Sequence, residues 1–199
     1  MARGRSRPLA FTGTSVVAEY NALPEKTQRR LERIFSAVRG VVPEEIKVWR
    51  FNTRDLVVGG RPPATIGEVK DWSKKDRLYL YTFQIATEGV DASRLLAEYR
   101  KARVEKVGGR AYARPHENAS PYLYVGSSEK IHQRLKEHLG FGAKGTYALQ
   151  LAYWASAVGI DVEFECARYP QGTNKDVIQA LEDTLWGDLS PMFGRQGAR

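Results

Sequence analysis

Cysteine is almost absent from this chain, since Cys166 is the only one among 199 residues. An intramolecular disulfide is therefore impossible, and the composition suits a reducing compartment, which favours a cytoplasmic location. Cys166 lies in the alternating segment 161–168, on the same side as Val162 and Phe164. We therefore expect a small buried side chain and not a nucleophile.

Long apolar runs are also lacking. No stretch approaches the roughly 18 consecutive apolar residues that a membrane-spanning helix needs, so we expect no membrane span. Residues 1–13 are basic and contain no long apolar core. We interpret them as a basic arm and not as a secretory signal. The sequence contains no internal repeat.

Acidic residues are too few to balance the basic ones. The chain has 31 Lys and Arg against 23 Asp and Glu, a net charge of +8, and a pI of about 9.6. This excess favours a polyanionic partner, with nucleic acid first and an anionic membrane surface second. Several basic residues are clustered and are candidates for phosphate contacts; the alternative is that they only form solvated helix faces. The candidates are Arg29, Arg30, Arg33, Arg100, Lys101, Arg103, Lys106 and Lys144.

The hydrophobic pattern predicts a mixed α/β or α+β domain. Its small, mostly antiparallel three-stranded sheet is flanked by helices. We expect strands at 76–86, 120–126 and 161–168, and helices at 91–107, 128–139, 146–158 and after 174. Residues 1–76 are interpreted as a basic N-terminal extension with an amphipathic helix starting at Pro24 and a short strand near 41–51. Residues 77–199 form the core, with a helical insertion at about 86–119.

Two cations lie beside the apolar stripe of the helix at 128–139. Ile131, Leu135 and Leu139 repeat every four residues, and Arg134 and His138 flank them one turn apart. These side chains either point into a cleft or belong to an ordinary solvated boundary. The preceding Ser127 and Ser128 either cap this helix or expose backbone N–H groups to an anion.

The last helix carries a carboxylate on its inward side. Glu182 lies between Ile178 and Trp186 at four-residue spacing. Because an unpaired buried charge costs several kcal/mol, it needs a cation nearby. That cation is either an arginine in a salt bridge or a divalent metal ion with water in its shell.

The order of these motifs resembles the GIY-YIG nuclease superfamily over about residues 77–197. The matching pieces are "YVG" at 124–126, the Arg134-Leu135-x-x-His138 pattern, and "LE" at 181–182 followed by "SPMFG". This sequence departs from the family pattern in its first motif, which has no glycine before the tyrosine. It also has Gly194 where many members have an asparagine, and Gln196 is the nearest candidate to replace it.

The resemblance implies specific roles for the site residues. Glu182 would hold one Mg²⁺ or Mn²⁺ ion, and Arg134 would bind the scissile phosphate. Tyr79 or Tyr81 would help to deprotonate the attacking water, and both share one strand face. Tyr124 would orient water or phosphate, and His138 would relay a proton or hold the phosphate.

These observations together predict a divalent-metal-dependent endonuclease that hydrolyses DNA, with duplex DNA as substrate and a restriction-type role. Two alternatives stay open: a nucleic-acid-binding module without cleavage, and a nuclease for RNA or single-stranded DNA. The oligomeric state is open as well, with a homodimer as one option.

Overall fold

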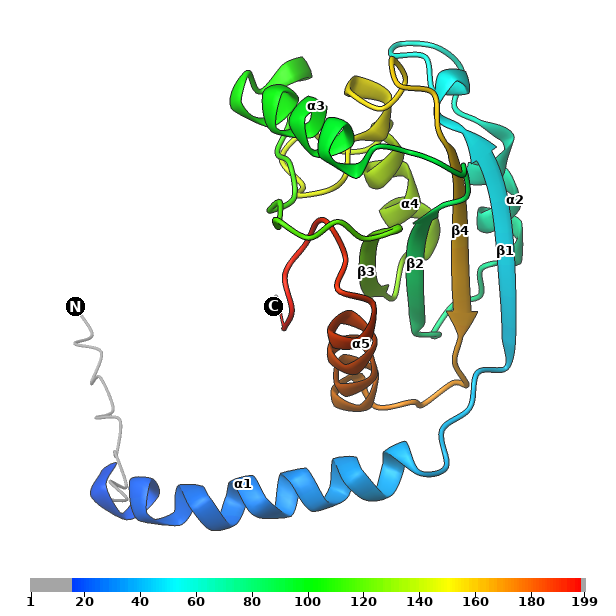
Figure 1. Cartoon of the computed structure of the whole chain (residues 1–199). Coiled ribbons are helices and arrows are strands. Elements are labelled where there is room, and N and C mark those ends of the chain that lie inside the picture. Colours follow the sequence, from blue (N-terminus) through cyan, green and yellow to red (C-terminus); the bar gives the residue numbers. More distant parts are fainter. Residues whose placement is uncertain (1–15, 198–199) are drawn as a thin grey trace, which may run out of the picture. The chain divides into compact units, whose positions relative to one another are not determined.

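The computed structural model describes residues 16–197 (Figure 1). The helices are α1 (Val16–Val38), α2 (Ala64–Trp72), α3 (Ala92–Val104), α4 (Ile131–Leu139) and α5 (Lys175–Leu189). The strands are β1 (Glu45–Asn52), β2 (Tyr79–Ile85), β3 (Tyr122–Ser128) and β4 (Asp161–Arg168). The basic arm predicted at residues 1–13 lies outside the described residues.

The chain divides after Gly40 into two compact units. The predicted boundary near residue 77 does not coincide with this division, because β1 and α2 belong to the second unit. In the first unit, α1 already includes Val16, so the predicted helix start at Pro24 is wrong. Proline suits the first turn of a helix, but a helix can also continue on its N-terminal side at the cost of one hydrogen bond.

The second unit is built on a four-stranded antiparallel sheet with the strand order β1-β4-β2-β3. The predicted fold class, a mixed α/β domain with a sheet flanked by helices, is confirmed. The predicted number of three strands is wrong, because β1 pairs with β4 from Glu45 opposite Arg168 to Asn52 opposite Asp161. The strand predicted near residues 41–51 therefore belongs to the central sheet and not to an extension.

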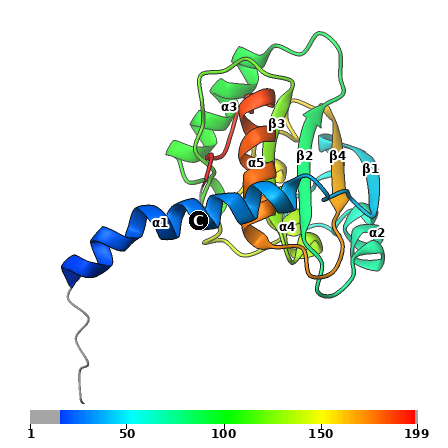
Figure 2. The same cartoon turned by 90° about the horizontal axis from the view of Figure 1, so that it is seen from below.

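The two faces of the sheet carry different helices (Figure 2). On one face, Tyr79, Tyr81 and Phe83 of β2 belong to the main core, which also contains buried residues of α2 and α4. On the other face, Leu80 packs in a smaller cluster with Ile178 of α5. The period-two alternation of β2 thus divides its side chains between two hydrophobic layers.

The segment after α4 is not the helix predicted at 146–158. It contains only a short 3₁₀ turn, Leu151–Tyr153. Its first residues bond to other segments: Ala113 N–H donates to the Ala148 carbonyl at 3.0 Å, and Leu149 N–H donates to His138 Nδ1 at 3.2 Å. Apolar composition suggested a helix here, but these long-range partners stabilise a buried loop.

The prediction for the single cysteine is confirmed. Cys166 is fully buried in the core, and this burial raises the pKa of its thiol. Within residues 16–197, no helix combines the length and the apolarity that crossing a bilayer requires.

Candidate active site

The centre of the candidate site is the hydroxyl group of Tyr81. Arg134 Nε donates to the Tyr81 hydroxyl at 3.1 Å, and His138 Nε2 lies 3.1 Å from the same oxygen. Arg134 also donates from one terminal nitrogen to the hydroxyl of Tyr124 at 3.1 Å. The rings of Tyr81 and Tyr124 are stacked with their centroids 6.1 Å apart. Residues from β2, β3 and α4 therefore form one hydrogen-bonded group.

The contacts of His138 define its protonation. Its Nδ1 accepts a hydrogen bond from Leu149 N–H, so Nδ1 carries no proton. Burial, together with the neighbouring Arg134 charge, holds the pKa of His138 well below its usual value. The ring is therefore neutral with its proton on Nε2, and Nε2 donates to the Tyr81 hydroxyl. His138 is fully buried, so it supports Tyr81 from behind and has no surface with which to hold a phosphate in this state.

Tyr81 therefore accepts hydrogen bonds from two donors. Burial raises the pKa of Tyr81 above its usual value, while the Arg134 charge opposes the rise, and the charges of Tyr124 and Glu182 add to it. The Tyr81 side chain is a neutral phenol at neutral pH. Once the proton leaves, however, the two donors favour the phenolate, because hydrogen bonds to the charged form stabilise it.

Arg134 is held by more partners than the sequence suggested. Besides the two tyrosine hydroxyls, it donates to the Tyr147 carbonyl at 3.0 Å and to the Glu137 carboxylate at 3.0 Å. A guanidinium group has five N–H donors, and these four bonds leave one of them over. Sequence reasoning missed Glu137, although its position three residues after Arg134 on one helix was a usable signal.

Gly126 explains why the two tyrosine rings can lie so close to β3. It is the register partner of Tyr81. A Cβ atom at this position would lie 2.8 Å from the Tyr81 hydroxyl oxygen and 2.8 Å from a ring carbon of Tyr124. The glycine of the "YVG" motif is therefore required sterically, because any side chain there would overlap both rings.

Tyr79 does not take part in this group. Its hydroxyl accepts from Lys74 N–H at 2.7 Å and donates to the Lys74 carbonyl at 3.1 Å, so it stabilises the turn before β2. Of the two candidates for the first-motif tyrosine, Tyr81 is the one that contacts Arg134 and His138. The expectation that either tyrosine could reach the site is corrected accordingly.

Glu182 lies on α5 and is half-buried, not enclosed as its predicted position between Ile178 and Trp186 implied. Its charge is near enough to Tyr81 to raise the pKa of that hydroxyl. Among the described residues, no three or more His, Cys, Asp or Glu side chains gather into a metal-binding group. A metal ion here would therefore depend on Glu182 and on oxygen atoms from water and substrate.

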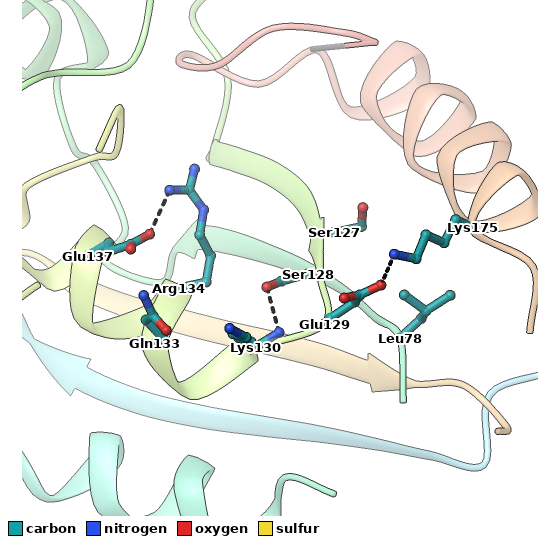
Figure 3. A pocket seen from close by; sticks show the side chains of 9 residues that line it. All are labelled: Leu78, Ser127, Ser128, Glu129, Lys130, Gln133, Arg134, Glu137 and Lys175. Atoms are coloured by element: carbon teal, nitrogen blue, oxygen red, sulfur yellow. Dashed lines mark hydrogen bonds and ion pairs between the residues drawn. The ribbon is translucent and has the colours of Figure 1, made fainter. Parts of the chain in front are cut away.

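An open cleft of about 470 Å³ adjoins the group (Figure 3). Arg134 and Glu137 point toward each other at one end, and Glu129 is ion-paired with Lys175 at the other. Ser127 and Ser128 also line the cleft, but they are the last residues of β3, so the predicted helix start at 128 is wrong. Ser128 Oγ accepts from Lys130 N–H at 3.0 Å, as in a turn.

The C-terminal segment closes the other side of Tyr124. A Cβ atom at Gly194 would lie 3.1 Å from the Tyr124 ring, so this residue packs directly against the site. The side chain of Gln196 donates instead to the Asp183 carbonyl at 3.1 Å, on α5. Gln196 is thereby engaged elsewhere and does not contact Tyr124 or Arg134 in this structure.

The predicted phosphate-binding cations fall into separate groups. Arg29, Arg30 and Arg33 are exposed on α1, where Arg29 pairs with Glu25. Residues of α3 and the turn after it form a second exposed group, comprising Arg100, Lys101, Arg103 and Lys106, and Lys144 is exposed on the loop after α4. Arg100 is paired with Glu117 at 3.2 Å.

Comparison with protein-family models, with curated proteins and with solved structures finds no match to this chain.

Proposed function

We propose that this chain is a divalent-metal-dependent endonuclease of the GIY-YIG type that hydrolyses phosphodiester bonds in duplex DNA, in a restriction-type role. The observation that carries the proposal is the hydrogen-bonded group of Tyr81, Tyr124, Arg134 and His138. Residues from three elements meet there beside an open cleft, with the carboxylate of Glu182 close by.

Each residue has a task that follows from its contacts. Arg134 neutralises charge on the non-bridging oxygens of the scissile phosphate through its remaining N–H. Tyr81 first releases its own proton to solvent water. The resulting phenolate, stabilised by Arg134 and His138, then accepts the proton of the attacking water. Tyr124 fixes the orientation of Arg134 and can donate its hydroxyl proton to water or phosphate. His138 is a positioning residue, because it acts through Tyr81.

The donor set fits Mg²⁺ or Mn²⁺. Mg²⁺ is commonly held by one or two carboxylates, several waters and substrate phosphate oxygens, which suits a single half-buried Glu182 at an open site. When bound, the ion would supply Lewis-acid stabilisation of the phosphate and help to activate water. Thiolate-preferring metals do not fit, since the only cysteine is in the core.

The test is cleavage of duplex DNA, single-stranded DNA and RNA by the purified chain, with Mg²⁺, with Mn²⁺ and with a chelator. We expect metal-dependent cuts within duplex DNA. The matched variants are Tyr81→Phe and Tyr79→Phe, because each removes one buried hydroxyl from the same strand face. Tyr81→Phe should lower the cleavage rate by about 10²-fold or more, whereas Tyr79→Phe should stay near the wild-type rate.

Other outcomes select the alternatives. Cleavage restricted to RNA or single-stranded DNA would keep the chemistry and change the substrate. Tight DNA binding without cleavage under any metal condition would favour a nucleic-acid-binding module. Equal losses from Tyr81→Phe and Tyr79→Phe would remove Tyr81 from the proposed role.

A further inference from the structure

Tyr124 and Arg134 also line a second cavity. Its volume is about 700 Å³, and Arg134 lines both this cavity and the cleft of Figure 3. We call it the arginine pocket, after four of its lining residues: Arg103, Arg114, Arg134 and Arg195. The remaining lining side chains include Tyr112, Tyr124 and Tyr147, and no carboxylate is among the described residues that line it.

The backbone around the pocket is held by long-range hydrogen bonds. Gly194 N–H donates to the Arg114 carbonyl at 2.8 Å, which fixes Arg114 beside Arg195. Tyr147 is tied to the site through its carbonyl, which accepts from Arg134. Arg103 comes from α3, in the last turn of that helix. Hydrogen bonds between segments that are distant in the sequence thus hold the backbone around one concave surface.

The charge of this surface indicates its ligand. Arg103, Arg114 and Arg195 are exposed, and their positive charges lie around one hollow together with Arg134. Arg134 is paired with Glu137, but the three exposed arginines carry like charges around one hollow. Their mutual repulsion disfavours the compact state, and such a local conflict is typical of a binding site. Arginine matches phosphate geometry especially well because its planar group presents paired donors.

The side chain of Tyr147 adds an aromatic surface at the same place. The residue is 71% exposed although it lies next to the buried group around Tyr81. An exposed ring beside a basic groove is the arrangement on which nucleic-acid bases stack, independent of sequence. The cavity volume is within the range of pockets that hold a small organic group, such as one nucleotide.

We infer that the arginine pocket binds the nucleotides adjoining the scissile phosphate on the cleaved strand. Arg103, Arg114 and Arg195 contact the flanking phosphates, and the Tyr147 ring stacks on a base. This inference rests on the proposed function for the position of the scissile phosphate at Arg134. In this arrangement the cleaved nucleic-acid strand continues from Arg134 into the arginine pocket. A charged phosphate flanking the scissile one is therefore part of the recognised substrate.

The experiment measures duplex DNA binding across a salt series, with the full chain carrying Glu182→Gln. The pocket variant replaces Arg103, Arg114 and Arg195 by Ala. Its control replaces Arg61, Lys70 and Arg94 by Ala, which removes the same charge from exposed positions that do not line the pocket. The slope of log affinity against log salt should fall by about 0.9 per lost phosphate contact in the pocket variant. The control should change the slope much less.

A second arm locates the contacts. Single phosphates of the cleaved strand are replaced by neutral methylphosphonates at successive positions. The chain with the intact pocket should bind less tightly when a phosphate flanking the scissile one is replaced. The affinity of the pocket variant should not change with those replacements. Tyr147→Ala should weaken binding and Tyr147→Phe should restore it, because the phenylalanine ring retains the stacking surface.

The outcomes separate this inference from the proposed function. If the chain cleaves DNA while the pocket variant binds like its control, the inference is overturned and the function stands. A second outcome is that the chain shows no cleavage while the slope of log affinity against log salt falls in the pocket variant and not in its control. In that case the pocket is a strand-binding site and the catalytic proposal fails. Binding of a free mononucleotide that leaves DNA affinity unchanged would also overturn the inference.

Discussion

Replacing Gly126 by alanine should disrupt the candidate site while leaving the sheet in place. The added Cβ atom would lie 2.8 Å from the Tyr81 hydroxyl oxygen and 2.8 Å from a Tyr124 ring carbon. Separations below about 3 Å are strongly repulsive, so both rings would have to move. They cannot move freely, because Arg134 bonds to both hydroxyls and Tyr81 is 2% exposed.

The size of the effect follows from overpacking. Inserting one methyl group into a tightly packed interior costs about 1–3 kcal/mol of unfolding free energy. For a chain of this length, that lowers the midpoint of thermal unfolding by roughly 2–12 °C. The effect on cleavage should be larger, about 10²-fold or more, because displacement of Tyr81 also misplaces Arg134 and His138.

The matched control is Gly67→Ala, in helix α2. A Cβ atom there would have nothing within 4 Å, and alanine favours a helix over glycine by about 1 kcal/mol, so this variant should be slightly more stable. Thermal unfolding and DNA cleavage are measured for both variants. Wild-type unfolding together with wild-type cleavage for Gly126→Ala would show that the two rings are not constrained as described.

Three further predictions concern the chemistry. Glu182→Gln should abolish cleavage while DNA affinity changes little, and near wild-type cleavage in Mg²⁺ would exclude Glu182 as the metal ligand. Arg134→Ala should lower the cleavage rate by about 10²-fold or more with a much smaller loss of binding; proportional losses would make it a general anchor. Because burial raises the pKa of Tyr81, its phenolate fraction increases with pH. The rate should therefore rise about tenfold per pH unit from pH 6 to 8 in a metal-saturated assay, and a flat profile would contradict Tyr81 as the base.

Local signals were sufficient for much of the core. The strand at 161–168 was predicted with the bounds that β4 has, because its alternation reflects one buried face and one partly exposed face. The helix ending before Pro191 was also predicted, and α5 begins at Lys175 after the cap residue Asn174. Both elements carry strong periodicity and clear end signals, and neither depends on a distant partner for its type.

Long-range pairing explains what could not be predicted. The β1 strand joins the sheet only through β4, more than a hundred residues later in the chain, where Arg50 reaches Glu163. Nothing local distinguishes such a strand from one in an extension. The helix predicted at 146–158 is wrong for a different reason. Most apolar residues of this segment are buried, as they would be in a helix, but part of its backbone bonds to Ala113 and His138.

The choice between Tyr79 and Tyr81 shows the same limit inside the site. Residues two apart on a strand share a face but lie about 6.8 Å apart along it. Which of them meets Arg134 depends on where α4 crosses the sheet and on the gap at Gly126, and both are tertiary features. The sequence therefore identified the type of residue and the face, while packing selected the individual side chain.

The contacts of Arg134 reconcile two demands that would otherwise conflict. A phosphate clamp must be rigid, yet an arginine that spends all its donors on the protein has none for the substrate. Four bonds to Tyr81, Tyr124, Tyr147 and Glu137 remove the freedom of a long side chain in advance, and one N–H is left over. A lysine has only three donors and no planar geometry, so it cannot replace these bonds and still meet a phosphate. The remaining N–H is on the nitrogen that bonds to Glu137, so a phosphate can meet it without breaking that bond or moving either tyrosine.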